Sequence, residues 1–443
     1  MLLIIAILMI IGGAVAVTSN SDTFSPAKFF LAFYLLFHVG AFFDPPTTVV
    51  AGLMAVPLFL AVLTTLNEAS HVQYLTSTRE TITVPLPQSR DVYSVLVLWA
   101  LSGPSIFAQY YMINELGGIA AYVGSIETRV QDWSGYGWAR TLIGLMSTLN
   151  VAYFAIGLVR RRESWWWGLF ALHFAITFFL GLGTGSRGGM LNILALLAIA
   201  FHYLKRPIGI PAASGLVVVL VGAASLFGVA RSNLKLEDGQ LTTGLATSTE
   251  SFSLNSFFYG IEPLDYITRA PQLILAEGST FLSFFTNAIP REIYPDKPDT
   301  GGVFFTINYA GNAWQGLSNL TPTFLGEWII NFGYLAGISG FFVSYGLLFH
   351  GLIRWYSRLL RDPSRIRDRL FAVDLVIYLH ALWAGVALMV GEFTNIALGF
   401  VLTQLIPLLA VRIALVLIPE PQAIAEARGG AGVVDRHAAR RMR

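Results

Sequence analysis

Long apolar runs are the feature that most constrains how this chain can fold. Eleven segments of about 20 residues each are long enough to cross a bilayer as helices. The chain is 55% hydrophobic and only 12% charged, about half the charged fraction of a soluble domain. The alternating strands of a β-barrel would not give unbroken apolar runs. We therefore predict an all-α polytopic membrane protein with about 11 (10–12) transmembrane helices. The expected spans are 1–17, 27–43, 47–66, 92–112, 141–159, 164–183, 189–204, 208–230, 323–353, 370–391 and 394–418.

The distribution of basic residues predicts the orientation, because Lys and Arg are retained in cytoplasmic loops. Alternating the spans places 19 of the 28 Lys and Arg on the cytoplasmic side and 8 outside, with Arg412 inside the last span. The N-terminus is then outside and the basic tail, residues 419–443, is cytoplasmic. Residues 1–17 lack a basic leader, so we expect a first span there and not a cleaved signal peptide.

The chain is expected to form a single integral membrane domain, residues 1–443, into which one large outer loop is inserted at 231–321. Residues 113–140 and 184–188 are expected on the same side. The loop holds five Lys and Arg against nine Asp and Glu, so it is net acidic. Apolar stretches at 251–267 and 272–289 predict short helices on the membrane surface.

Whole-chain features exclude several classes of function. The chain has no cysteine, which excludes disulfides, thiol nucleophiles and cysteine metal sites. A net charge of +2 gives no argument for nucleic-acid binding. We find no internal repeat of the kind that builds many transporters. There is also no Walker motif, zincin motif or Ser-His-Asp arrangement, and we expect neither a metal nor a cofactor.

A glycine-rich turn joins the sixth and seventh spans. Gly185, Ser186 and Arg187 lie within Gly-Leu-Gly-Thr-Gly-Ser-Arg-Gly-Gly, where no strand precedes a dinucleotide-type fingerprint. Free backbone N–H groups at the start of a helix, with an arginine beside them, suit a phosphate at the membrane surface. The alternative is a tight interhelical turn with Arg187 at the lipid headgroups.

The large loop presents further candidate cations. Arg291 and Lys297 lie in a segment whose backbone is restricted by three prolines between residues 290 and 298, and such a segment can hold two cations for a pyrophosphate. Alternatively, local carboxylates neutralise both cations in exposed ion pairs, which contribute only about 0–1 kcal/mol each. These carboxylates are Glu292, Asp296 and Asp299. Arg231 follows the eighth span directly, where arginines often extend only to headgroups.

Glu327 stands at the outer entry to the ninth span. An ionisable residue just inside an apolar segment is costly unless paired, which makes it a functional candidate. It can serve as a base, as a proton relay or as the partner of an arginine. Asn331, one helical turn further on, is expected to face the same side. Glu392 near the end of the tenth span is a weaker case of the same kind.

Histidines and aromatic residues have simpler interpretations. His173, His202 and His380 have no second ligand at metal-binding spacing and are expected to pack between helices. An outer aromatic belt is expected from five residues, with stacking on a sugar ring as the alternative. They are Tyr110, Tyr111, Trp133, Tyr136 and Trp138.

Together, the motifs resemble the Wzy-type O-antigen and oligosaccharide repeat-unit polymerases. The resemblance is carried by Thr184-Gly185-Ser186-Arg187-Gly188, by Pro290-Arg291 before Pro295-Asp296-Lys297-Pro298, and by Gly326-Glu327 with Asn331-Phe332-Gly333. The stretch from Gly117-Gly118 to Arg129 is also similar. These motifs cover most of residues 110–350, whereas the first three spans and the tail carry no signature.

The resemblance implies a metal-independent membrane glycosyltransferase of the GT-C-like class in the bacterial inner membrane, with its large loop periplasmic. Such enzymes join undecaprenyl-pyrophosphate-linked repeat units into O-antigen, capsule or exopolysaccharide. The implied partners are these lipid-linked glycans and membrane lipids, together with a chain-length regulator and a flippase. No nucleic acid is expected.

The resemblance also suggests roles for the candidate residues. Arg187, Arg231 and Arg291, with Lys297 in support, would hold pyrophosphate, and Glu327 would orient or deprotonate the acceptor hydroxyl. The remaining substrate-binding candidates are Gly185, Ser186, Arg129 and Asn331.

Two alternatives remain. An O-antigen ligase uses the same donor, but the resemblance leads us to expect a histidine in a ligase's large loop, and residues 231–321 contain none. A non-catalytic transporter or flippase would predict repeated halves and charges near the bilayer midplane.

Overall fold

The computed structural model describes most of the chain. It covers residues 2–72, 91–126, 132–133, 135–159, 163–183, 187–232, 234–237, 240–243, 260–289, 291, 293–311, 320–361 and 368–417. Its helices are α1 (Leu2–Ser19), α2 (Pro26–His38), the 3-10 helix η1 (Val39–Phe42), α3 (Thr48–Val72), α4 (Val92–Glu115), α5 (Ile119–Gly124), α7 (Gly137–Leu158), α8 (Ser164–Gly183), α9 (Arg187–Leu204), α10 (Ile210–Ser232), α11 (Glu262–Arg269), α12 (Ser279–Thr286), α13 (Gly301–Asn308), α14 (Thr323–Leu359), α15 (Arg369–Ala387), α16 (Phe393–Gly399), the π-helix η4 (Phe400–Leu405) and α17 (Ile406–Leu417).

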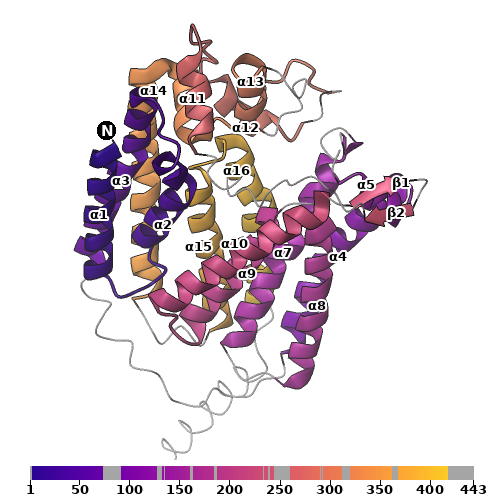
Figure 1. Cartoon of the computed structure of the whole chain (residues 1–443). Helices are drawn as coiled ribbons and strands as arrows, with labels where there is room; N and C mark the ends of the chain where they lie inside the picture. The colour runs from indigo at the N-terminus through magenta and orange to yellow at the C-terminus, as the bar shows by residue number, and fades with distance from the viewer. Residues whose placement is uncertain are drawn as a thin grey trace, which may run out of the picture.

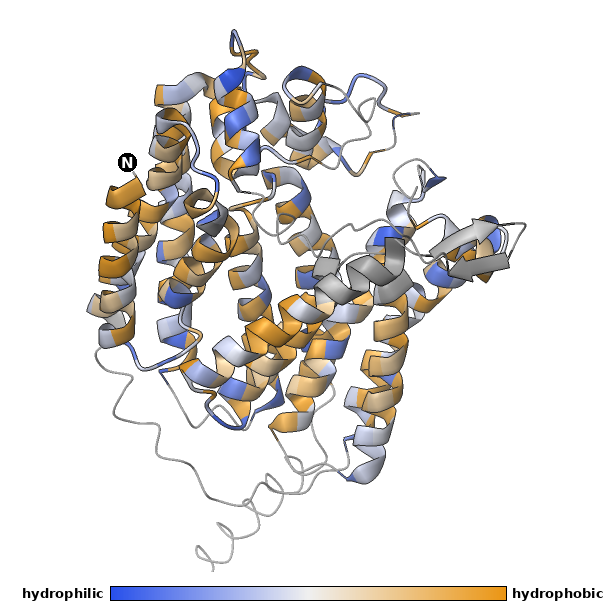
Figure 2. Ribbon diagram, viewed as in Figure 1, coloured by the Kyte–Doolittle hydropathy of each residue, from blue (hydrophilic) through white to orange (hydrophobic). Residues whose placement is uncertain are grey.

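The described chain is a helical polytopic membrane protein, as the apolar runs predict. Eight helical stretches within it are long and apolar enough to cross a bilayer, and three shorter apolar helices accompany them: Pro26–His38, Leu191–Leu204 and Ile210–Ala223. α16, η4 and α17 together form one of the eight, Phe393–Leu417. Apolar residues predominate along the long helices, whereas hydrophilic residues are frequent on α11 (Figure 2).

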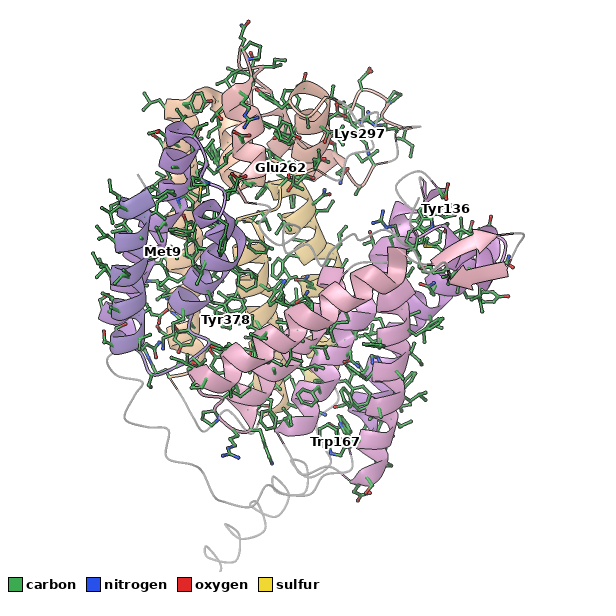
Figure 3. The ribbon with its side chains drawn as sticks, viewed as in Figure 1. Met9, Tyr136, Trp167, Glu262, Lys297 and Tyr378 are labelled. Atoms are coloured by element: carbon green, nitrogen blue, oxygen red, sulfur yellow. The ribbon has the colours of Figure 1, made fainter. Side chains whose placement is uncertain are left out.

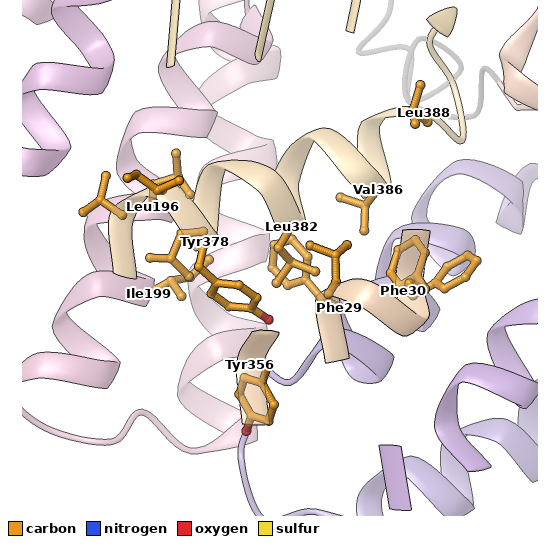
Figure 4. Packing of buried hydrophobic residues seen from close by; sticks show 14 of the residues in the cluster. Phe29, Phe30, Leu196, Ile199, Tyr356, Tyr378, Leu382, Val386 and Leu388 are labelled. Carbon is orange, nitrogen blue, oxygen red and sulfur yellow. The ribbon is translucent and has the colours of Figure 1, made fainter. Parts of the chain in front are cut away.

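α15 is the central helix of the bundle. Its Tyr378, Leu382 and Val386 are buried and lie among aromatic and aliphatic side chains from α2, α9 and α14 (Figure 4). Tyr345 of α14 donates a hydrogen bond from its hydroxyl to the carbonyl of Gly385 at 2.8 Å. This packing fixes α14 against α15 along much of their length.

The cap, defined as α11, α12 and α13 together, covers one end of the bundle beside the start of α14 (Figure 1). α12 lies within the predicted stretch 272–289 and α11 overlaps the end of the stretch 251–267, although residues 251–259 lie outside the described part. The loop also contains two short strands that the sequence analysis does not predict, β1 (Leu234–Glu237) and β2 (Gln240–Thr243). They pair antiparallel and lie next to α5 (Figure 1).

A buried polar cluster ties together elements at the opposite end of the bundle. Asp22, in the link between α1 and α2, accepts hydrogen bonds from His202 at 2.9 Å and from Tyr356 at 2.6 Å. Although burial opposes the change, these hydrogen bonds lower the pKa of Asp22 to about 2. His202 is therefore a packing residue between helices, as expected. At the same end, Arg369 donates to Asp91 at 3.1 Å and to the Leu415 carbonyl at 3.0 Å.

α14 does not run straight from residue 323, in contrast to the single span predicted for 323–353. Gly333 has φ 77° and ψ 176°, a backbone conformation that essentially only glycine adopts. The helix therefore divides into a first arm (residues 323–332) and a second arm (residues 334–359). The rings of Phe324 and Tyr345 lie 5.8 Å apart, so the first arm folds back along the second.

Two glycines of the second arm allow the first arm to pack closely against it. A side chain at Gly340 would lie 2.3 Å from the Trp328 ring, and one at Gly337 would lie 2.7 Å from the Trp328 carbonyl. Phe324 donates its backbone N–H to the Leu388 carbonyl at 3.1 Å, which anchors the start of the arm to the end of α15. The first arm is consequently enclosed by the cap, α15 and α16.

The expected aromatic belt is only partly observed. Tyr110 and Trp138 are exposed, 69% and 48% respectively. Trp133 is buried; its ring stacks on Tyr122, with centroids 5.2 Å apart, and its indole N–H donates to Ser125 at 2.8 Å. Trp133 therefore belongs to a small core formed with α4, α5, α7 and α8, and not to a surface belt.

Candidate functional site

Glu327, on the first arm of α14, is a completely buried carboxylate beneath the cap. The hydroxyl of Thr280, from α12, donates to its Oε1 at 2.9 Å. The backbone N–H of Phe393, at the start of α16, donates to its Oε2 at 2.6 Å. Both oxygens thus have a donor, and the side chain joins α12, α14 and α16.

Glu392 brings a second buried carboxylate to the same place. It lies in the link between α15 and α16, and it accepts hydrogen bonds from the Gly302 N–H and from the Asn395 side chain. Gly301 separates the two acids. A Cβ on Gly301 would lie 2.6 Å from Oε1 of Glu327 and 3.1 Å from Oε2 of Glu392. The two glycines therefore allow the start of α13 to lie directly against both carboxylates.

The electrostatics of this carboxylate pair, Glu327 and Glu392, are unfavourable for two negative charges. Among the described residues, neither acid forms an ion pair with a cation. Burial raises the pKa of Glu392 to about 8, and the charge of Glu327 acts in the same direction, against partial lowering by hydrogen bonds from Thr300 and Asn395. A buried acid next to a like charge holds its proton more tightly. Glu392 is thus protonated more readily than an ordinary glutamate.

Asn331 completes the hydrogen bonding around Glu327. Its Nδ2 donates to Thr280 Oγ1 and to the Glu327 carbonyl, both at 2.7 Å, and its Oδ1 accepts from the Gly278 N–H at 2.8 Å. The prediction that Asn331 and Glu327 face the same side is confirmed. In this structure Asn331 fastens the start of α12 to the first arm of α14.

The carboxylate pair fastens the cap to the bundle. Glu392 binds the first turn of α13, Glu327 binds α12 and α16, and carboxylates at helix N-termini are stabilised by the helix dipole. Polar hydroxyls extend the network, with Ser283 and Thr394 2.8 Å apart. Because Glu327 is fully enclosed, its carboxylate can meet a substrate hydroxyl only after α12 or α13 is displaced.

The loop cations Arg291 and Lys297 contact their own loop. Arg291 is half-exposed and donates to Asp299 at 2.6 Å and to the Pro295 carbonyl at 3.0 Å. Lys297 donates to the carbonyls of Asn287 and Ile289, at 3.0 and 2.6 Å, just after α12. Lys297 lies at the edge of the cap, at the same end of the molecule as Glu262 (Figure 3). The local-pairing alternative thus describes Arg291 in this structure, and none of its hydrogen bonds links it to Glu327.

The other predicted cations are described only in part. Arg187 begins α9 and Arg231 lies in the last turn of α10, but their side chains fall outside the description. Gly185, Ser186 and Arg129 lie outside the described residues altogether. The pyrophosphate clamp as a whole therefore remains a prediction.

Glu392 is more central to the site than its sequence position indicates, and Gly301 and Gly302 were not predicted as site residues. One signal was available: Gly301-Gly302 follows the proline-restricted segment after two residues, and glycines often mark a close backbone approach. Arg140 was likewise not predicted as a site residue; its guanidinium lies 6.0 Å from the centre of the Trp133 ring. What no local pattern shows is that residues 302 and 392 meet.

No group of three or more His, Asp or Glu side chains with metal-binding geometry occurs in the part of the chain that the structure describes. Comparison of the chain with models of protein families, with curated proteins and with solved structures finds no match.

Proposed function

We propose that this protein is a polymerase of undecaprenyl-pyrophosphate-linked oligosaccharide repeat units in the bacterial inner membrane. The observation that carries the proposal is the enclosed Glu327, held beneath a cap of short helices at one end of a membrane bundle. Lipid-linked sugars present their reactive groups at that level of a membrane. The proposed reaction is inferred from the sequence resemblance, and its proposed location, beneath the cap and beside the bilayer, is inferred from the position of Glu327.

The proposed topology has eleven spans and a GT-C-like arrangement. In support of this count, each of the three shorter apolar helices overlaps an expected span that is not among the eight longer stretches. The cap would face the periplasm, and the Asp22 cluster would lie at the cytoplasmic end. The meeting of Asp22, His202 and Tyr356 at one end supports the alternation, because the topology assigns all three to one side.

The proposed reaction is attack of an acceptor hydroxyl on the anomeric carbon of the donor glycan. A new glycosidic C–O bond forms while the C–O bond to pyrophosphate breaks, and pyrophosphate leaves with the electron pair. Glu327 takes the proton of the hydroxyl once the cap has moved aside. Arg187, Arg231 and Arg291 stabilise the charge on the leaving pyrophosphate, and Arg291 exchanges Asp299 for the substrate.

Expression of variants in a strain that lacks the native gene tests these roles through the length distribution of surface polysaccharide. A charge-assisted hydrogen bond contributes about 1.5–3 kcal/mol, so Arg187→Ala or Arg291→Ala should slow chain growth about ten- to a hundredfold. Glu327→Gln keeps size and polarity but cannot accept the proton, and should stop elongation. Asp265→Asn, which alters an ion pair with the exposed Arg269 on α11, is the matched control. Normal long chains from all three site variants at native expression would refute the assignments.

An O-antigen ligase is the second candidate, and one contact favours it. His38, at the end of α2, packs against Gly260, where a Cβ would lie 2.8 Å from the imidazole Nε2. The large loop thus has a histidine beside it, although none lies within its own sequence. This weakens the argument against a ligase, so the acceptor must be tested directly.

A further inference from the structure

The carboxylate pair has a property that the proposed reaction does not yet use. Glu327 and Glu392 are both fully buried, and one oxygen of each, Oε1 of Glu327 and Oε2 of Glu392, lies against Gly301. Two ionised carboxylates that close, without a cation, repel each other strongly in a medium of low dielectric constant. A proton between them removes the repulsion.

Among the described residues around the carboxylate pair, no positively charged group is present that could remove this repulsion in place of a proton. α12 contributes the hydroxyl of Thr280, and α13 contributes backbone N–H groups. α16 contributes the neutral side chain of Asn395 and the backbone N–H of Phe393. Among the described residues, the only titratable group facing either acid is therefore the other acid.

We propose that the two acids share one proton across the first turn of α13, and that Glu392 is the positioning residue that carries it. Both acids accept hydrogen bonds from backbone N–H groups, Glu327 from Phe393 and Glu392 from Gly302. Glu327 is the acid that remains ionised, because burial and the charge of Glu327 beside it raise the pKa of Glu392. Glu392 thereby holds Glu327 ready as a base while keeping α13 in place. This inference rests on the proposed function only for the role of Glu327 as base.

The first test is the pH dependence of thermal unfolding of the purified full chain in detergent. The pKa of Glu392 is raised from 4.5 to about 8, so its protonated form is the one that the fold prefers. The stability that the protonated form of Glu392 contributes to the fold is fully present below pH 4.5 and is lost as pH rises through about 8. The wild-type melting temperature should fall between about pH 7 and pH 9 more steeply than that of Glu392→Gln, which cannot ionise.

Matched variants make this test decisive. Glu327→Gln removes the repelling charge and should also flatten the alkaline fall, whereas Asp265→Asn should keep the wild-type slope. Parallel curves for wild type and Glu392→Gln would overturn the shared proton. The measurement needs no substrate, so it stands or fails independently of the polymerase proposal.

The second test uses the pH profile of polymer formation, which a merely structural role would not move. With Gln at 392 the proton that the pair shares is missing, so the ionised form of Glu327 loses that support, and the acidic limb of the profile should move to higher pH by about one unit. Glu392→Ala also loses the hydrogen bonds to Gly302 and Asn395, so its rate should fall while Gln preserves turnover near the optimum. An unchanged acidic limb in an active Glu392→Gln enzyme would overturn the positioning role. Absence of polymer from the wild type would refute the polymerase alone.

Discussion

At the scale of single residues, the site depends on where side chains are absent as much as on which are present. Gly301 and Gly302 allow backbone to approach two carboxylates that no other described residue neutralises. Sequence reasoning identified Glu327 because an acid within an apolar run is conspicuous. It could not rank Glu392 correctly, since the importance of that residue comes from a contact with the backbone of residue 302, ninety positions away.

Substitution of Gly301 tests this close approach. Gly301→Ala would place a methyl group 2.6 Å from Oε1 of Glu327. The carboxylate is buried and hydrogen-bonded on both oxygens, so it cannot move without losing a partner. We expect a loss of about 1–3 kcal/mol in the free energy of unfolding, measured by chemical or thermal denaturation. Gly137→Ala is the control, because a Cβ there meets nothing within 4 Å; equal effects of the two changes would contradict the arrangement.

At the scale of elements, the hydrophobic pattern predicts most helices because burial in a bilayer requires long apolar runs. It fails at the start of α14, where the runs before and after Gly333 are both apolar and read as one span. The reversal depends on the backbone conformation of a single glycine and on the space that Gly337 and Gly340 leave for Trp328. Packing of that kind is not visible in residue periodicity. The strand pair β1–β2 was missed for the related reason that each strand has only four residues.

The change of chain direction at Gly333, between the two arms of α14, also changes the interpretation of the loop cations Arg291 and Lys297. With the first arm folded under the cap, Glu327 is enclosed by α12, α13 and α16. Arg291 and Lys297 instead brace the loop between α12 and α13 through Asp299 and backbone carbonyls. Asp299, one of the three acids predicted as possible partners, is the partner of Arg291, and which of the acids forms the pair depends on loop geometry that the sequence does not show.

At the scale of the whole molecule, the sidedness of the chain determines whether the site can meet lipid-linked sugars. The natural absence of cysteine allows single cysteines to be placed without background. Asp265→Cys lies on the cap, and Lys205→Cys lies just beyond α9 on an exposed position at the end opposite the cap. In intact cells with a permeable outer membrane, a membrane-impermeant maleimide should label position 265 and not position 205. The reverse labelling would invert the proposed topology.

The central claim, that this chain joins lipid-linked repeat units, is tested most directly by reconstitution. The purified full chain in liposomes receives one undecaprenyl-pyrophosphate-linked repeat unit, and the lengths of the glycans on the lipid are measured by mass spectrometry. The proposal predicts a ladder of lipid-linked glycans from wild type and Asp265→Asn, and only the starting unit from Glu327→Gln. A product that forms only when lipid A core is added, or no product from the wild type, would contradict the claim.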